Sequence, residues 1–213
     1  NSVWTKLAIG IPTFKENRPV AITETIAINS LADLTNNASR TDVNFNLNVD
    51  LEISLTRTAT STQKVLEVLN GVFNGNGHKI TITATGPTQD EMNTAGKNDV
   101  ATNNFIGTVS EFGEVKNLRI SYSHISLANG YGGSLVFGTM NGYVHDVELT
   151  VSHTNHWQEG SLGVLGLDGT GKYENIVLTA TGGMNQEGKF YLANDAAVFE
   201  NVLVVVQAGN DLT

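Results

Sequence analysis

Two acidic residues near the middle of the chain, Asp146 and Glu148, are separated by a single residue, and Asp168 and Glu174 follow further along. Glycoside hydrolysis commonly uses a pair of carboxylates, so this grouping permits that chemistry. However, Asn stands at the position of Asp146 in three related segments of the chain. We therefore expect Asp146 to cap a turn and Glu148 to form a solvated ion pair with Arg119.

A second group of residues that could bind a ligand contains His153, His156 and Trp157, to which we add Tyr131. The two histidines alone do not complete a zinc site, which needs three or four ligands, so we expect no metal and no cofactor. An aromatic face beside hydrogen-bonding groups suits a sugar. We interpret these four residues as a weak ligand-binding surface, and the alternative is a polar loop that only packs locally.

One type of segment recurs four times in the second half of the chain. The copies are Gly113–Tyr122, Gly142–Val151, Gly171–Ala180 and Ala197–Val206. Their Asn or Asp residues are spaced by 29, 29 and 26 residues. A strand-like pattern with a repeat of this size indicates one supersecondary unit that stacks on its neighbours.

The apolar alternation changes phase at the Asn or Asp of each copy. In the second copy Val144 is apolar, and the apolar set then continues as Val147, Leu149 and Val151. Side chains of a strand alternate strictly between faces, so this shift requires a bend. Asn and Asp tolerate left-handed backbone angles well. The predicted corner residues are Asn117, Asp146, Asn175 and Asn201.

A further strand is predicted before each of the first three copies, at residues 104–109, 134–140 and 162–167. Each of these segments contains a glycine, and we expect Gly107, Gly138 and Gly166 to lie in register. Three short strands then form one coil of a parallel β-solenoid, and successive coils pair edge to edge.

The best copy reads GGSLVFG over Gly132–Gly138 and GYVHDV over Gly142–Val147. These residues resemble the GLUG repeat of bacterial surface proteins, and more broadly the right-handed parallel β-helix of the pectin-lyase-like superfamily. The resemblance covers roughly residues 43–209. It implies an all-β, right-handed parallel β-helix (solenoid) of about five or six coils with an N-terminal cap.

The resemblance further implies a secreted or cell-surface module for adhesion or glycan binding, without catalysis. A polysaccharide lyase or glycoside hydrolase on the same scaffold is the alternative, since one fold hosts many functions. Lyases of the superfamily bind calcium through clustered Asp residues. Here Asp42, Asp50 and Glu52 are dispersed along one segment, which is not the ligand set that calcium requires.

The composition excludes several classes of partner. The net charge is −9 with a pI near 4.9, and no cluster of Lys or Arg occurs, so we expect no nucleic-acid binding. There is no Cys, which excludes disulfides. No apolar run approaches the length that crosses a bilayer, so we expect no membrane insertion.

Residues 1–42 are predicted to form an N-terminal cap of strand and helix, and residues 43–213 the β-helix. Ser30 followed by Asp33 indicates a helix start, and a helix near residues 30–38 can plug the open end of a solenoid. The predicted partner is a glycan or another cell-surface polymer.

The residues predicted to face outward after the corner change along the stack. In sequence order they read Thr81/Thr83, Arg119/Ser121, Glu148/Thr150, Val177/Thr179 and Leu203/Val205. A flat Thr-rich face can bind ice, but Arg119 and Glu148 interrupt this one, so we do not expect that function. Because Leu203 to Val206 are apolar on both faces, we expect a further domain or a second chain to cover the last coil.

Overall fold

Strands dominate the computed structural model, which describes residues 4–6, 12–14, 21–96, 103–127, 131–154, 160–166, 168–183, 189–193 and 196–206. These residues contain two short helices, α1 (Leu31–Asn36) and α2 (Gln89–Thr94). Strands β1 (Trp4–Lys6) and β2 (Pro12–Phe14) form an antiparallel pair of their own. The other strands build three parallel sheets, so the protein is an all-β protein.

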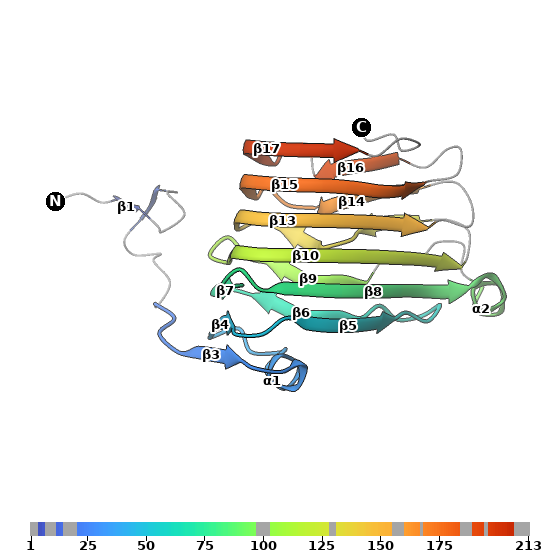
Figure 1. Cartoon of the computed structure of the whole chain (residues 1–213), viewed down its shortest axis with the longest axis horizontal. Coiled ribbons are helices and arrows are strands. Elements are labelled where there is room, and N and C mark those ends of the chain that lie inside the picture. Colours follow the sequence, from blue (N-terminus) through green and yellow to red (C-terminus); the bar gives the residue numbers. More distant parts are fainter. Residues whose placement is uncertain are drawn as a thin grey trace.

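The largest sheet contains nine strands in the order β17-β15-β13-β10-β7-β4-β3, with β8 between β10 and β5. Its strands are β3 (Thr25–Ile28), β4 (Asn44–Leu47), β5 (Leu51–Thr56), β7 (Val72–Asn74), β8 (Lys79–Thr88), β10 (Glu114–Leu127), β13 (Tyr143–Thr154), β15 (Lys172–Gly183) and β17 (Val198–Val206). Figure 1 shows the long strands lying one above another in chain order.

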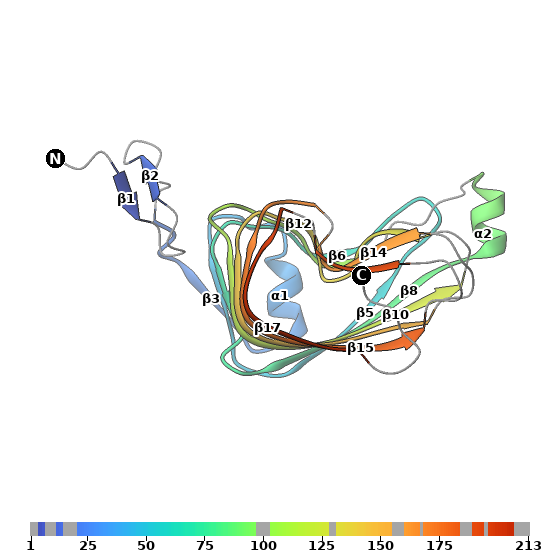
Figure 2. The ribbon, with the colours of Figure 1, turned by 90° about the horizontal axis from the view of Figure 1, so that it is seen from above.

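Two three-stranded sheets complete the fold, in the orders β12-β9-β6 and β11-β14-β16. Their strands are β6 (Lys64–Leu69), β9 (Asn104–Val109), β11 (Tyr131–Ser134), β12 (Phe137–Met140), β14 (Gly160–Gly166) and β16 (Lys189–Ala193). Seen along the stack, the chain passes repeatedly around a common interior, with the large sheet bent on one side (Figure 2).

The pairing register reproduces the repeat found in the sequence. Leu118 pairs with Val147, Val147 with Ile176, and Ile176 with Val202, all in parallel strands. The residues predicted to point inward from β10, β13 and β15 are buried, with exposed fractions of at most 4%: Leu118, Ile120, Tyr122, Val147, Leu149, Val151, Ile176, Leu178 and Ala180.

Each copy of the repeat bends at its Asn or Asp. Asn117, Asp146, Asn175 and Asn201 have φ angles of 51°, 55°, 53° and 52°, in the left-handed region. Asn76, with φ 50°, occupies the same kind of position beside β8 and was not among the predicted corner residues. The left-handed residue lets the apolar set change phase without loss of strand pairing on either side.

An aromatic stack fills the interior near the first strands. The rings of Phe45 and Phe73 lie 6.0 Å apart, and Phe73 meets Phe105 edge-on at 5.4 Å. Helix α1 lies beside β3 at one end of the stack (Figure 1), and its Leu34 is fully buried. Ser30 caps α1 by accepting a hydrogen bond from the backbone N–H of Asp33, as its sequence pattern predicts.

The predicted strand 134–140 is wrong in detail, because the chain changes sheets within it. Strand β11 ends at Ser134 and pairs with β14, whereas β12 begins at Phe137 and pairs with β9. The predicted register of Gly138 with Gly166 is also wrong. Ser134 pairs with Gly163 and Thr139 with Asp168, which places Gly166 level with Phe137. Glycine spacing alone does not define a register when the strand is interrupted.

Candidate functional site

The corner residues form a partial ladder of side-chain hydrogen bonds along the outside of the stack. Asn201 Nδ2 donates to Asn175 Oδ1 at 3.2 Å, and Asn175 Nδ2 donates to Asp146 Oδ1 at 3.0 Å. At the other end Asn117 Nδ2 donates to Asn74 Oδ1 at 3.1 Å. The ladder fixes these polar groups in position on the surface.

Asp146 breaks this ladder, because a carboxylate has no N–H to donate toward Asn117. Its Oδ2 atom instead lies 2.7 Å from Nδ1 of His145. Hydrogen bonds from His145 and then Asn175 hold the pKa of Asp146 below its usual value. An Asn at this position could serve the corner equally well, so the carboxylate is not required by the backbone geometry.

A network of charged side chains lies on the outward face just before the corner, and we call it the charged network. Its members are Glu114, Lys116, Tyr143, His145, Lys172, Glu174 and Glu200. Strands β10, β13, β15 and β17 carry them at matching positions of the repeat, so parallel pairing brings them side by side.

His145 lies at the centre of the charged network. Its Nε2 atom is 3.0 Å from a carboxylate oxygen of Glu114, and its other nitrogen faces Asp146. Its ring stacks on that of Tyr143 with centroids 4.5 Å apart. The imidazole therefore lies between two carboxylates and connects the charged network to the corner residue Asp146.

Further contacts of the charged network shift pKa values in both directions. Burial works to raise the pKa of Glu114, but hydrogen bonds from Lys116 and His145 outweigh it and lower that pKa. Partial burial, together with the hydrogen bond from the Tyr143 hydroxyl to Glu174, raises the pKa of Tyr143 to about 12. Glu114 is therefore ionised and Tyr143 neutral at neutral pH.

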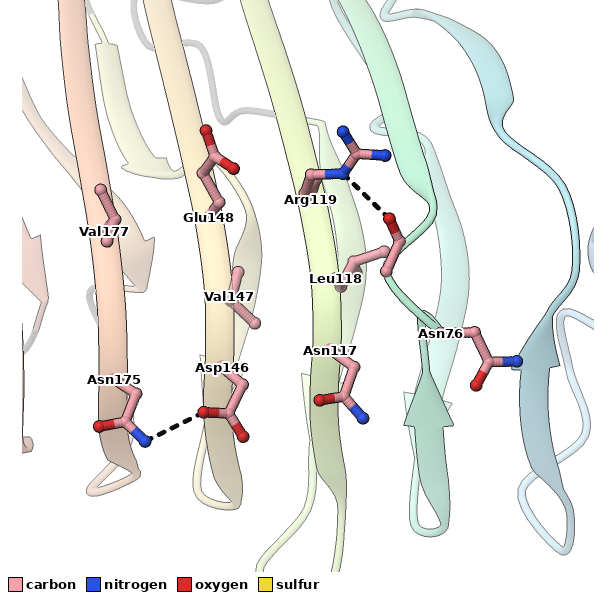
Figure 3. Close-up of a pocket in the computed structure, with 10 residues that line it drawn as sticks. Asn76, Asn117, Leu118, Arg119, Asp146, Val147, Glu148, Asn175 and Val177 are labelled. Atoms are coloured by element: carbon pink, nitrogen blue, oxygen red, sulfur yellow. Dashed lines mark hydrogen bonds between the residues drawn. The ribbon is translucent and has the colours of Figure 1, made fainter.

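An open groove of about 500 Å³ lies beside the corner, next to the charged network. Figure 3 shows Arg119, Glu148 and Val177 side by side on neighbouring strands, with the corner side chains Asn117, Asp146 and Asn175 along one edge. Amide and carboxylate groups thus alternate with apolar surface in one shallow depression.

The expected ion pair between Arg119 and Glu148 is absent from the described side chains. The two residues are register partners on β10 and β13, yet Arg119 Nε donates to the backbone oxygen of Gly77 at 3.0 Å. The turn that contains Gly77 brings a fixed carbonyl within reach of the guanidinium. Glu148 therefore faces the groove without a salt bridge among the described residues.

The side chains of the ligand-binding surface predicted from the sequence lie outside the described part of the structure. The backbone of Tyr131 belongs to β11 and pairs with Gly160. The backbone of His153 belongs to β13 and pairs with His124. His156 and Trp157 lie outside the described residues, so whether the four form one patch stays a prediction.

Comparisons with protein-family models, with curated proteins and with solved structures find no match to this chain. The GLUG resemblance therefore rests on the sequence motifs alone.

Neither a metal cluster nor a membrane-spanning helix is found among the described residues. Groups of three or more His, Asp and Glu side chains with suitable geometry are absent there. None of the described helices is long and apolar enough to cross a membrane. The acidic residues considered for catalysis are also separated: Asp168 pairs through its backbone with Thr139, away from the groove, while Glu174 belongs to the charged network.

The charged network was missed at the level of the sequence, although a signal for it exists. When the repeats are aligned, the two outward positions before each corner read Glu114/Lys116, Tyr143/His145, Lys172/Glu174 and Val198/Glu200. Polar and ionisable residues thus gather at equivalent positions of successive copies. The apolar residues of the repeat define the buried face. The signal for the charged network lies in the polar residues that alternate with them and point outward.

Proposed function

We propose that this protein is a right-handed parallel β-helix of the GLUG-repeat type, within the pectin-lyase-like superfamily. Its role is that of a secreted or cell-surface module, of bacterial type, that binds glycans and promotes adhesion without catalysis. Parallel pairing at offsets of 29 and 26 residues supports the helical winding. The corner Asn residues and the glycine-rich motifs support the likeness to GLUG repeats.

The observation that carries the proposal is the groove beside the corner. Its volume of about 500 Å³ lies within the range of small-ligand sites. Its carboxylate, amide and guanidinium groups can bind sugar hydroxyls, and Val177, which is 42% exposed, offers an apolar surface. The ladder and the charged network hold several of these groups in place before a ligand arrives, which lowers the entropic cost of binding.

Charge narrows the class of glycan. The groove contains two carboxylates, Asp146 and Glu148, against the single guanidinium of Arg119. Arg119 also already donates to a backbone oxygen. The whole chain carries a net charge of −9. We therefore expect neutral or amino sugars to bind better than uronic-acid polymers, because like charges repel.

Catalysis at the same groove is the alternative. Asp146 and Glu148 both line it, and His145 lies between Asp146 and Glu114 much as an orienting group would. Paired carboxylates of this kind occur in glycoside hydrolases. Incubation of the protein with any bound glycan, followed by analysis for new reducing or unsaturated ends, separates an enzyme from a binding module.

We expect the Asp146→Asn variant to bind its glycan at least about tenfold more weakly, since a hydrogen bond to a charged group is lost. The same change supplies the amide that the ladder lacks but removes the carboxylate that faces His145, so thermal stability should change little. A glycan array followed by calorimetry with the best ligand measures the first effect, and thermal unfolding measures the second.

The control for this experiment is Glu67→Gln, which removes one carboxylate from an exposed Lys64–Glu67 pair on β6, in another sheet. This variant should bind like the wild-type protein. Glycan affinity that is unchanged in Asp146→Asn would show that the groove is not the binding site.

The edge strand β17 exposes apolar side chains that a partner could cover. Val198, Phe199, Leu203, Val205 and Val206 are 37–57% exposed, although they are apolar. Among the described strands β17 pairs with β15 alone, so its outer backbone groups are unpaired. An exposed apolar edge of this kind is an association site.

We propose that a second copy of this chain covers the β17 edge. Antiparallel pairing about a twofold axis at Val204 places Leu203 opposite the partner's Val205 and Val202 opposite the partner's Val206, so apolar residues meet over Val202–Val206. Glu200 is the one charged residue in Val198–Val206, and Lys172 binds it at 3.0 Å. Two acidic chains can therefore approach each other here with little repulsion.

Sedimentation equilibrium tests this interface. We expect the wild-type chain to be a dimer and the Leu203→Asp, Val205→Asp double variant to be a monomer, because four carboxylates then meet in one contact. The Ser54→Asp, Thr56→Asp variant adds the same charge at exposed positions of β5 and should remain dimeric. A wild-type monomer at all concentrations would overturn the proposal.

A further inference from the structure

Beyond the corner, the outward face of the large sheet presents two adjacent rows of hydroxyl side chains, which we call the hydroxyl face. The first row contains Thr81, Ser121, Thr150 and Thr179. The second row contains Ser54, Thr83, Ser123, Ser152 and Thr181. The residues of each row are direct register partners, so the face is a two-dimensional array.

Charged residues lie outside these two rows. Arg119 and Glu148 form a separate row next to the corner, where they line the groove. Their interruption of the face, expected from the sequence, therefore does not occur within the array. The first row is bordered by Glu52, the register partner of Thr81 on β5, and by Val205, the register partner of Thr179 on β17.

The hydroxyl groups are available to bind something outside the protein. Thr181 Oγ1 donates to the backbone oxygen of Val151 at 3.3 Å. The other eight hydroxyl groups form no hydrogen bond with any described residue. Each hydroxyl can both donate and accept, so the array can bind water in either orientation.

The array is regular because the backbone beneath it is regular. Neighbouring strands lie about 4.8 Å apart, and alternate residues of one strand about 6.6 Å apart. Thr side chains are restricted about χ1, and the inward residues between the rows, such as Ile82 and Tyr122, are tightly buried. Both rows run across parallel strands in direct register, so the hydroxyl groups of each row repeat at the strand spacing.

A flat, uncharged and repeating hydroxyl surface suits a ligand that is itself flat and repeating. A free sugar fits the concave groove better, and the two rows contain no cationic side chain that would bind an anion. The strand spacing is close to the distance between equivalent oxygen atoms in planes of hexagonal ice. Water molecules bound along the rows are thus held near an ice-like arrangement. The entropic cost of ordering them when the surface contacts an ice crystal is therefore small.

From this geometry we propose that the hydroxyl face binds ice. The proposal is independent of glycan binding, because the two surfaces share no residue. A protein that adsorbs to ice depresses the freezing point below the melting point and shapes the crystals that grow. We expect the wild-type chain to show both effects, and to be enriched in a slowly grown ice fraction.

The decisive variant is Thr150→Tyr, in the first row of the hydroxyl face. Its ring projects above the flat surface and prevents contact along both rows, so freezing-point depression should fall at least about tenfold, as at the centre of other contact surfaces. The control is Thr108→Tyr, which puts the same ring on β9 in another sheet and should leave the depression unchanged. Circular dichroism and the glycan affinity of each variant show whether it is folded.

Three results would count against ice binding. These are absence of freezing-point depression and of ice enrichment in the folded wild-type chain, full activity in Thr150→Tyr, and equal loss in the control. Glycan binding through the groove would persist in the first two cases, so failure of this proposal and failure of the proposed function are distinguishable.

Discussion

Replacement of Leu149 by alanine should lower the free energy of unfolding by about 2–5 kcal/mol, the usual range for a leucine removed from a packed core. Leu149 is 1% exposed and pairs with Ile120 on one side and Leu178 on the other, both of them buried. Strands on both sides fix the neighbouring side chains, so the cavity cannot collapse easily. Urea denaturation measures the change.

Val177→Ala is the matched control for Leu149→Ala. Val177 lies on the next strand and is 42% exposed. Its truncation therefore removes less buried apolar surface than the truncation of Leu149 does. We expect a loss below about 1 kcal/mol, as for other surface positions. If Leu149→Ala cost no more than this control, the inward assignment of β13 would be wrong.

The change of phase at the corner is the feature of the sequence that predicts the bent, stacked strands of this fold. Apolar residues at alternate positions define an inward face, and their shift by one residue at Asp146 requires a left-handed residue there. The structure places φ 55° at that position. Repetition of the pattern at fixed spacing then predicts parallel pairing, because each copy can bury its apolar residues against the next.

Two features were not predicted because they depend on irregular segments. The chain leaves one sheet after Ser134 and enters another at Phe137, which an apolar pattern alone does not reveal. Arg119 donates to the carbonyl of Gly77, which lies in the turn between β7 and β8. This turn is two residues longer than the matching segment of β10. Such contacts are set by loop geometry, which a strand pattern does not contain.

The burial of His124 could have been read from the sequence. It continues the inward series Leu118, Ile120 and Tyr122 along β10, and its exposed fraction is 2%. A histidine at an inward position is taken out of water, which favours its neutral form. This position therefore connects the apolar pattern with a pH-dependent property of the whole protein.

Acid should destabilise the protein in a window set by His124. Burial, and then the nearby charge of Arg57, lower the pKa of His124 to about 4 from an ordinary value of 6.5. The unfolded chain therefore takes up a proton at a higher pH than the folded chain. Stability from this group is complete above about pH 6.5 and is lost as the pH falls toward about 4, by about 3 kcal/mol in total.

The His124→Gln variant should remove most of this slope, because glutamine does not titrate. Its stability at pH 7 can differ from that of the wild type, so the quantity to compare is the change in unfolding free energy between pH 7 and pH 4.5. Ser123→Gln, at an outward position of the same strand, is the control, because it introduces a glutamine without removing a titratable group.

Carboxylates with lowered pKa values, such as Glu114 and Asp146, also lose stabilising charge in acid, but they do so as the pH falls below their unfolded values of 4.5 and 3.8. The window above about pH 4.5 thus isolates the histidine contribution. Parallel stability curves for the wild type and His124→Gln across that window would show that His124 is protonated, or reached by water, in the folded protein.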